Sequence, residues 1–221
     1  MVNKKRTSPK GRPRGTGRDS RGGLFLAAAR EFAERGYEAA GVDRIAQKAG
    51  VSKAMLYYHF GSKLGLYHDV LGDMFLAVGQ RARAIADGPG DAEQKLDAWI
   101  LTIAEEAQER PWFPPIMLRE IASGGPHLDA ETLGRMNAVV GTIRDIVVQG
   151  QQEGLFRDID PLLVHLTITP TILIFFARQG VVARRGAVGG VAAPIPPEAF
   201  IGHITTTARR MLRIGAPGGG A

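Results

Sequence analysis

The sequence of 221 residues contains no cysteine, and this absence excludes several classes of protein. Disulfide scaffolds, thiolate nucleophiles, iron–sulfur clusters and cysteine-ligated zinc sites all require that residue. The five histidines lack the spacing of metal ligands, and no nucleophile elbow, zinc-protease motif or phosphate-binding loop occurs. An enzyme therefore has nothing positive to support it. We expect no cofactor, no metal ion and no catalytic activity.

Long hydrophobic runs are also scarce. The basic N-terminus is not followed by an apolar stretch, so we expect no secretory signal. The longest nearly apolar stretch is Leu162–Ala177, which His165, Pro170 and three threonines interrupt. It is shorter than the roughly 20 residues that span a bilayer. We therefore expect a buried helix in a soluble, cytoplasmic protein that makes no membrane contact.

No convincing strand pattern occurs, whereas apolar residues recur at helical spacing throughout the chain. Glycine, serine and aspartate stand at the ends of the periodic segments, as helix-capping residues do. The pattern predicts an all-α fold. The expected helices cover approximately Gly23–Arg35, Val42–Ala49, Lys53–Phe60, Lys63–Ala86, Ala92–Glu109, a short stretch around Met117, Ala130–Glu153, a helix from Pro161 that Pro170 kinks, and Glu198–Arg213.

Positive charge is concentrated at the front of the chain. The formal net charge is +6, and residues 1–22 hold eight basic side chains and one acidic side chain. Residues 67–221 hold 14 basic and 17 acidic side chains. This asymmetry indicates a polyanionic partner for the front end. Residues 1–22 are also too poor in large apolar side chains to fold alone, so we expect a basic disordered arm.

Two interpretations of this arm stay open. It could act only as a solubilising tail. The segment Lys10-Gly-Arg-Pro-Arg14, however, resembles the core of an AT-hook, in which arginines beside glycine and proline enter a narrow A·T-rich minor groove. In that case Arg12 and Arg14 contact DNA.

The most informative segment is Asp43–Phe60, in which Gly50-Val51-Ser52 joins two short helices. Gly50 supplies a positive φ at the turn, and the small Ala46 lets the two helices approach closely. The apolar residues at this joint are spaced to face inward. The remaining face suits a helix that lies in the major groove of DNA, and it consists of Lys53, Ala54, Met55, Tyr57, Tyr58 and His59.

Each residue type on this face has a counterpart on DNA. Lys53 can reach a guanine edge or a phosphate, and Ala54 and Met55 offer apolar contact to a thymine methyl group. Hydrogen bonds to phosphate oxygens are possible for the polar side chains Tyr57, Tyr58, His59 and Lys63. Other interpretations stay open, because either tyrosine could belong to the core and the histidine could be a structural one.

This segment resembles the helix-turn-helix of the TetR family of transcriptional regulators. The likeness runs from Ala46 to Leu64 almost throughout, includes the preceding Phe32–Tyr37, and covers roughly residues 20–70. The family commonly has threonine or serine at the start of the second helix, where this chain has Gly41. That departure implies that Arg44 or backbone N–H groups make the missing phosphate contact. The resemblance implies phosphate contacts for Tyr57, His59 and Lys63, and base contacts for Lys53, Ala54, Met55 and Tyr58.

The resemblance divides the chain into the arm at 1–22, a DNA-binding domain at 23–66, and an effector-binding and dimerisation domain at 67–215. TetR-like regulators keep an effector cavity among the helices of the last part. Large apolar side chains there are more often core than pocket, so a packed or water-filled interior is the alternative. The candidate ligand-binding residues are Trp99, Glu106, Trp112, Phe113, Met117, His127, Asn137 and His165.

The last two long helices are candidates for a dimer interface. The helix that starts at Pro161 is too apolar to leave exposed, and the helix Glu198–Arg213 carries a matching stripe. Two chains would then form a four-helix bundle. The candidate interface residues are Leu162, Leu166, Ile172, Phe176, Phe200, Ile204, Ala208 and Met211.

These features together predict a homodimeric, ligand-responsive transcriptional regulator. We expect a repressor that binds a pseudo-palindromic DNA operator and responds to a small-molecule effector of unidentified structure. The alternative is an architectural protein that binds nucleic acid without regard to sequence, through the basic arm. A preference of about a thousandfold or more for one site over random duplex distinguishes the regulator from the architectural protein.

Overall fold

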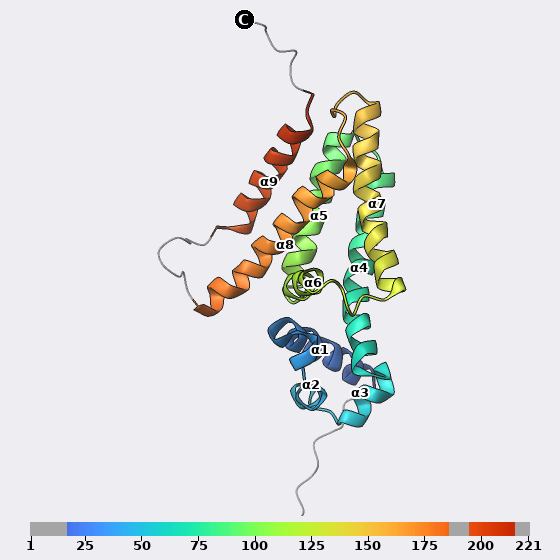
Figure 1. Cartoon of the computed structure of the whole chain (residues 1–221), viewed down its shortest axis with the longest axis vertical. Coiled ribbons are helices and arrows are strands. Elements are labelled where there is room, and N and C mark those ends of the chain that lie inside the picture. The colour runs from blue at the N-terminus through green and yellow to red at the C-terminus, as the bar shows by residue number, and fades with distance from the viewer. Residues whose placement is uncertain (1–16, 186–194, 215–221) are drawn as a thin grey trace, which may run out of the picture.

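The computed structural model describes residues 17–185 and 195–214 (Figure 1). Within these ranges the regular structure is helical, apart from an isolated backbone bridge between Phe156 and Arg213. The all-α fold class is therefore confirmed. The helices are α1 (Gly17–Ala39), α2 (Val42–Ala49), α3 (Lys53–Phe60), α4 (Lys63–Asp87), α5 (Ala92–Glu109), α6 (Phe113–Ala122), α7 (Ala130–Gln152), α8 (Pro161–Arg185) and α9 (Pro197–Leu212).

The helices form a small three-helix end and a larger body, which α4 connects (Figure 1). α1, α2 and α3 lie together, and α4 runs from α3 into the body, where it packs along α7. α5, α6 and α8 complete the body, and α9 lies against α5 and α8. One hydrophobic cluster extends through both parts, from Leu24 and Leu56 to Trp99 and Ile143. α4 therefore contributes side chains to the hydrophobic core of both parts.

α1 begins at Gly17, earlier than the expected start at Gly23, so part of the expected arm is helical. Tertiary contacts hold this extension in place. Arg21 forms an ion pair of 2.6 Å with Asp69 of α4, and its guanidinium lies over the ring of Phe60. The sequence periodicity missed these residues because the added turns lack a large apolar side chain.

Glycines with positive φ end helical segments where the sequence predicts. Gly36 (φ 76°) interrupts α1, although helical structure resumes as far as Ala39, beyond the expected end at Arg35. Gly50 (φ 69°) adopts the left-handed conformation between α2 and α3. A side chain at either position would be strained, since L-residues rarely adopt this backbone conformation.

Three of the four helix caps that the sequence predicts are present, including Asp160, whose carboxylate accepts a hydrogen bond of 2.8 Å from the Leu162 amide at the start of α8. The Ser62 hydroxyl accepts a hydrogen bond of 2.9 Å from the Gly65 amide at the start of α4. Asp91 and Gln94 form a complete capping box at the start of α5. Ser52 has the extended backbone of a cap before α3, but its side chain makes no capping hydrogen bond, so that expectation was wrong.

α8 differs from the expected buried helix. It continues through Pro170 and is 25 residues long. By length and composition alone, Pro161–Val182 could cross a membrane, with a mean hydropathy of 1.5, although core helices of soluble proteins pass the same test. One side of α8 packs on α5, α6 and α7, while Leu163 and Ile174 on its other side are 55% and 56% exposed. The apolar pattern could not distinguish a fully buried helix from one with an open apolar face.

Candidate DNA-binding face and effector cavity

The outer face of α3 is open to solvent. Leu56 is fully buried and anchors the helix, whereas Tyr58 is 80% exposed and Tyr57 is 45% exposed. Lys53 and Ala54 are also exposed, and Met55 is half-buried. The exposure expected for Lys53 and Tyr58 is therefore confirmed. A duplex can reach this face without displacing any described part of the body.

The basic side chains around α3 have partners within the chain. Lys53 pairs with Asp43 at 3.2 Å, and the Lys63 ammonium donates to the Glu38 carbonyl at 3.2 Å and lies over the Tyr37 ring. These ion pairs and hydrogen bonds are exposed, and such contacts contribute little in water. The two lysines can therefore exchange these partners for phosphate oxygens at small cost.

Arg44 and His59 are held more firmly. Arg44 lies 3.3 Å from Glu31, a carboxylate with no exposed side-chain surface. His59 is half-buried, and its Nε2 lies 2.9 Å from the Ser20 hydroxyl on α1. This contact fits the structural alternative for His59. Phosphate contact by His59 stays a prediction, and Arg12 and Arg14 lie outside the described residues.

Glu31 is a feature of the small end that the sequence analysis missed. Its carboxylate lies 3.1 Å from Arg35 and 2.8 Å from Lys48, in addition to Arg44. The hydrogen bond from Lys48 to Glu31 raises the pKa of that lysine. The available signal was an acidic residue on the inward face of the first helix, three positions after Ala28.

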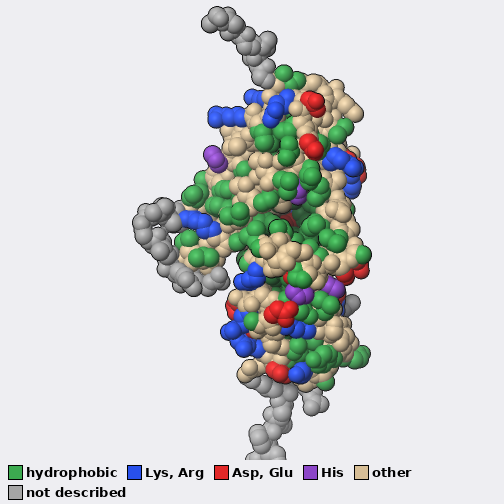
Figure 2. Space-filling view, viewed as in Figure 1, with side chains coloured by type: hydrophobic (Ala, Val, Ile, Leu, Met, Phe, Trp, Pro, Cys, Tyr) green, Lys and Arg blue, Asp and Glu red, His purple; other side chains and the backbone are tan. Residues whose placement is uncertain are grey.

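A cavity of about 390 Å³ lies among α4, α5, α6, α7 and α8. In Figure 2 hydrophobic side chains line a hollow in the body near α6 and α8. The sequence analysis missed much of the lining, including Met74, Phe75 and Val78 of α4. Helical spacing could not separate core-facing from cavity-facing residues. Five predicted ligand-binding residues do line the cavity: Glu106, Phe113, Met117, Asn137 and His165.

The other three predicted ligand-binding residues lie elsewhere. Trp99 is fully buried and donates from Nε1 to the Thr142 hydroxyl at 2.9 Å. Trp112 is buried edge-on against Phe25 of α1. His127 lies at the junction of the two parts of the molecule. These three residues therefore do not line this cavity, because residue type alone does not reveal which neighbours satisfy a side chain.

The carboxylate in the cavity wall, Glu106, is paired with two arginines that do not line the cavity. Glu106 is 3% exposed and accepts a hydrogen bond of 2.8 Å from Arg81 and another from Arg110. The hydrogen bonds to Glu106 and its neighbour Glu105 raise the pKa of Arg81. Burial lowers the pKa of His165, which favours its neutral form at pH 7. The described lining therefore presents polar groups without an unpaired charge.

α6 connects this cavity with the small end of the molecule. Phe113 and Met117 of α6 line the cavity. Two residues further along the chain, the Arg119 guanidinium donates to the carbonyls of Phe32 and Ala33 at 3.1 and 3.0 Å, just before the break in α1. Arg119 thus binds backbone carbonyls in the last turn of α1 before the break at Gly36.

Glu120 of α6 binds the start of α4 and the loop after α6. Its carboxylate accepts a hydrogen bond of 2.7 Å from Tyr67 and lies 2.8 Å from Nδ1 of His127. Burial and the hydrogen bond to Glu120 raise the pKa of Tyr67. The His68 ring contacts the backbone carbonyl of His127 at 2.9 Å. The junction is therefore a connected polar network and not part of the cavity.

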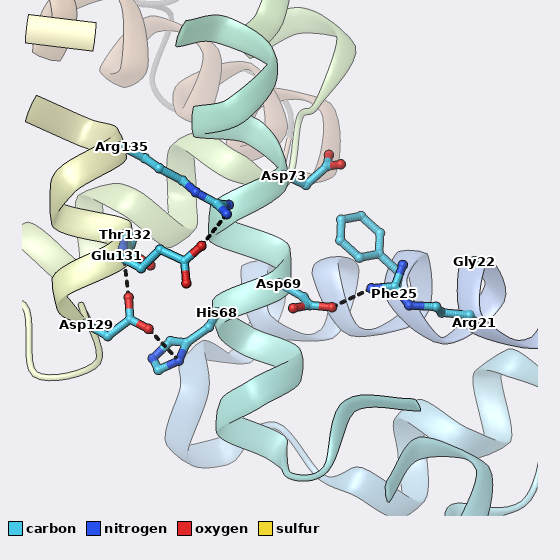
Figure 3. Close-up of a pocket in the computed structure, with 10 residues that line it drawn as sticks. All are labelled: Arg21, Gly22, Phe25, His68, Asp69, Asp73, Asp129, Glu131, Thr132 and Arg135. Carbon is cyan, nitrogen blue, oxygen red and sulfur yellow. Dashed lines mark hydrogen bonds and ion pairs between the residues drawn. The ribbon is translucent and has the colours of Figure 1, made fainter. Parts of the chain in front are cut away.

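A second, polar crevice of about 430 Å³ lies between α1, α4 and α7 (Figure 3). Polar side chains in it contact one another: Arg21 pairs with Asp69, and Nδ1 of His68 lies 3.1 Å from Asp129. Among the described residues no group of three or more histidine or carboxylate side chains could hold a metal ion. These pairs connect helices to one another, and we assign no ligand to the crevice.

The candidate dimer residues fall into two groups. Leu162 and Leu166 are 50% and 55% exposed, and Phe200 and Met211 are half-buried. The other four are buried in their own protomer because α8 and α9 turn these faces toward the body, so their assignment to the interface needs correction: Ile172, Phe176, Ile204 and Ala208. The exposed apolar residues of α8 also include Leu163, Ile174 and Val181, which the sequence analysis did not select.

Comparison with known families gives two matches along the chain. Residues 24–70 match the family described as bacterial regulatory proteins, tetR family. Residues 93–184 match the family described as tetracyclin repressor-like, C-terminal domain. The first match contains α2, α3 and most of α1, and the second contains the helices that surround the cavity from α5 to α8.

Individual relatives agree with these matches. The chain is 30% identical to the transcriptional repressor KstR2 of Mycobacterium tuberculosis, over 68% of this chain and 76% of that protein. It is 28% identical to the repressor NicS of Pseudomonas putida, over 71% and 74%. The solved structure of the ketosteroid regulator KstR2 of M. tuberculosis superposes with a TM-score of 0.69 at 26% identity, covering 88% of this chain and 95% of the other.

Proposed function

Because the chain belongs to the TetR family of bacterial transcriptional regulators, we propose that it is a cytoplasmic, homodimeric repressor that an effector releases from a pseudo-palindromic operator. As a member of this family it is a DNA-binding regulator of transcription, and we propose no catalytic role. The observation that carries the DNA-binding part is the solvent-exposed outer face of α3. Repression is proposed because KstR2 and NicS carry that name.

In the proposed complex each subunit places α3 in the major groove, N-terminal end first. Tyr58, Lys53, Ala54 and Met55 lie on the side that meets base edges. Phosphate contacts come from the remaining polar side chains, which are Arg44, Tyr57, His59 and Lys63. The exposed pair of Lys53 with Asp43 favours this arrangement, because phosphate can replace a carboxylate at the surface without leaving a buried charge unpaired.

The second subunit is proposed to cover the open apolar face of α8. Leu163 and Ile174 lie on this face, and apolar side chains in such numbers on one helix mark an interaction surface. We expect Ile174→Glu to give monomers in sedimentation analysis, whereas Leu76→Glu on α4 leaves the dimer intact. A dimer that survives Ile174→Glu, or wild-type protein that partitions into lipid vesicles, would contradict this assignment.

The effector is proposed to occupy the cavity and to act through α4 and α6. α4 contributes to the cavity wall and begins next to the recognition helix, while α6 contacts α1 through Arg119. A ligand that favours a different position of these helices alters the spacing of the two recognition helices. It can do so only to the extent that it binds that state more tightly.

The coupling role of α6 is tested with Arg119→Met. In coupled systems one ligand changes the affinity for another by roughly 5- to 150-fold. We expect Arg119→Met to bind operator and effector nearly as the wild type does but to lose most of the effect of one on the other. Arg144→Met on α7 is the matched control, since Arg144 is exposed and pairs only with its neighbour Asp145 among the described residues. Full coupling in Arg119→Met would exclude this route.

Selection of bound duplexes from a random pool, followed by sequencing, tests the function as a whole. We expect an inverted repeat that the protein prefers over random duplex by about a thousandfold or more. Recovery of unrelated sequences with similar affinities would support the architectural protein instead. Activation of a reporter by bound protein would leave the regulator standing but replace repression.

Deletion of residues 1–16, which precede α1, tests the proposed minor-groove contacts of Arg12 and Arg14. We expect weaker binding to all sequences and a smaller salt dependence, because fewer phosphate-bound counterions are released. If the operator affinity and its salt slope do not change, the arm does not take part in DNA binding.

A further inference from the structure

The lining of the cavity among α4–α8 restricts the chemistry of the molecule that it can hold. Its walls are methionine, phenylalanine, valine, leucine and isoleucine side chains, with polar groups from four residues. One of these, Asn137, is solvent-exposed. The polar residues within the wall are Glu106, His165 and Thr169. A ligand must therefore bury mainly apolar surface.

The cavity offers no counter-charge to an ionic ligand. No lysine or arginine lines it, and each oxygen of Glu106 already accepts a hydrogen bond from an arginine. A carboxylate would face Glu106 without a cation, and an ammonium group would compete with Arg81 and Arg110 for the same oxygens. Burial of either ion is unfavourable because its hydration is not replaced.

His165 supplies the hydrogen-bonding position. Its Nδ1 lies 3.2 Å from the Thr169 hydroxyl, and its Nε2 has no hydrogen-bond partner among the described residues. If Nδ1 carries the proton, Nε2 accepts a hydrogen bond; if the threonine donates to Nδ1, Nε2 carries the proton and donates. A hydroxyl group satisfies both tautomers, since it is donor and acceptor at once.

Pro170 adds a second acceptor nearby. Proline has no N–H, so the carbonyl of Leu166, four residues earlier, lacks its usual donor in α8. Leu166, Thr169 and Pro170 all line the cavity together with His165. This stretch of α8 therefore supplies polar groups to the wall in addition to Glu106.

We propose that the cavity takes a neutral, mainly apolar alcohol, whose hydroxyl group meets Nε2 of His165 while its hydrocarbon part fills the space toward α4 and α6. This inference rests on the proposed function, in which the same cavity is the effector site. It names the chemical class of the effector: a long-chain or alicyclic alcohol and not an organic acid, an amine or a phosphorylated compound.

Competition binding with the full-length protein tests this class. The measurement is the displacement, at pH 7, of the neutral fluorescent probe N-phenyl-1-naphthylamine by 1-decanol, decanoate or decylammonium. These three competitors have the same hydrocarbon chain and differ in their polar group. We expect decanol to displace the probe at concentrations at least about tenfold lower than the two ions do, since tenfold corresponds to only about 1.4 kcal/mol. Preference for either ion would overturn the proposal.

Variants locate the hydroxyl group. We expect His165→Leu to weaken decanol binding about three- to tenfold, as the loss of one hydrogen bond does, without weakening the apolar probe. His165→Gln keeps a hydrogen-bonding group and should restore most of the affinity. His203→Leu, which removes an exposed histidine from α9, is the matched control, and thermal melts verify that each variant is folded. Equal decanol affinity in His165→Leu would refute the contact.

Operator binding, measured on the same preparations, distinguishes a failure of the proposed ligand class from a failure of the proposed function. Protein that binds its operator but prefers decanoate retains the proposed function and loses this chemistry. Protein without a preferred operator fails the proposed function itself. Decanol that binds without changing operator affinity would show that the cavity is not the effector site, and would overturn the inference.

Discussion

Glu31 at the three-helix end and Glu106 beside the cavity are both buried carboxylates that pair with arginine, but their surroundings differ. Glu31 is surrounded by three basic side chains, Arg35, Arg44 and Lys48, whose side chains remain 41–46% exposed. Glu106 pairs with Arg81 and Arg110, neither of which lines the cavity. At the surface, three cations thus face Glu31 and Glu34, which leaves excess positive charge. The arginines of Glu106 also pair with Glu105, Asp73 and Glu109, and no lysine or arginine lines the cavity.

This difference shows how one kind of contact serves two functions. A buried ion pair adds little net stability, because the loss of hydration offsets most of the attraction. Its consequence here is the charge that remains for a partner. At α1–α3 a polyanion meets unneutralised cations, whereas in the cavity an ionic ligand meets none. Four predictions test this contrast, from the largest expected effect to the smallest.

The DNA end should be most sensitive at Tyr58. This side chain is 80% exposed and makes no described contact with the body, so Tyr58→Ala should leave the melting temperature nearly unchanged. Loss of a base-edge contact costs about 1–3 kcal/mol, which corresponds to roughly 5- to 150-fold in operator affinity. Fluorescence anisotropy with a labelled operator measures the loss. Unchanged affinity would remove Tyr58 from the interface.

The substitution Glu106→Gln should change which ligand charge the cavity prefers. This substitution removes the negative charge next to the cavity, while Arg81 still pairs with Glu105 and Arg110 still pairs with Asp73. Decanoate should then bind about tenfold or more tightly than to the wild type, because a unit charge at short range contributes several kcal/mol before desolvation. Displacement of the neutral probe provides the measurement, and decanol serves as the internal control. No gain for decanoate would mean that Glu106 does not determine the charge of the cavity.

Substitution of Lys63 and substitution of Lys53 should have different effects on DNA binding. Lys63→Ala should weaken binding to all sequences by a similar factor and reduce the salt slope by about one, as loss of a phosphate contact does. Lys53→Ala should alter the preferred sequence. Affinities for the operator and for a set of single-base variants, measured at several salt concentrations, separate these outcomes. Identical effects of both substitutions on every sequence would contradict the assignment.

The smallest effect concerns His165 and pH. Burial lowers its pKa in the folded state, so the unfolded state binds the proton more readily below about pH 6.5. The contribution of neutral His165 to the free energy of unfolding is therefore fully present at pH 7. It declines as the pH falls through 6.5 toward the lower pKa of the folded state. His165→Gln should flatten this decline in urea titrations between pH 7 and 5, and His203→Gln controls for the loss of one histidine. A profile that stays parallel to the wild type would refute the effect.

Features that depend on the local backbone were predictable from the sequence. Gly50, Ser62 and the Asp91–Gln94 pair were predictable because each involves only the local backbone: a positive φ, or a side chain that bonds an amide three residues away. The open face of α3 was predictable for a similar reason. The tight turn between two short helices fixes which face of α3 packs inward, and the opposite face must then be exposed.

Residues far apart in sequence were not predictable in this way. Phe113 and Trp99 are both large apolar residues in the sequence, yet only Phe113 lines the cavity. His127 looked like a ligand-binding residue, but Glu120 and His68 satisfy its polar groups at the junction. Arg119 carried no signal, because its acceptors lie more than 80 positions earlier in the chain.

From the sequence by itself follow the helices, most of their ends, the exposed face of α3 and the family, because these depend on spacing and on contacts within a few residues. Only the tertiary structure decided which side chains surround the cavity, how Glu31 and Glu106 are neutralised, and which side of α8 stays open. Packing between helices determines these features, and such packing depends on partners that no local pattern encodes.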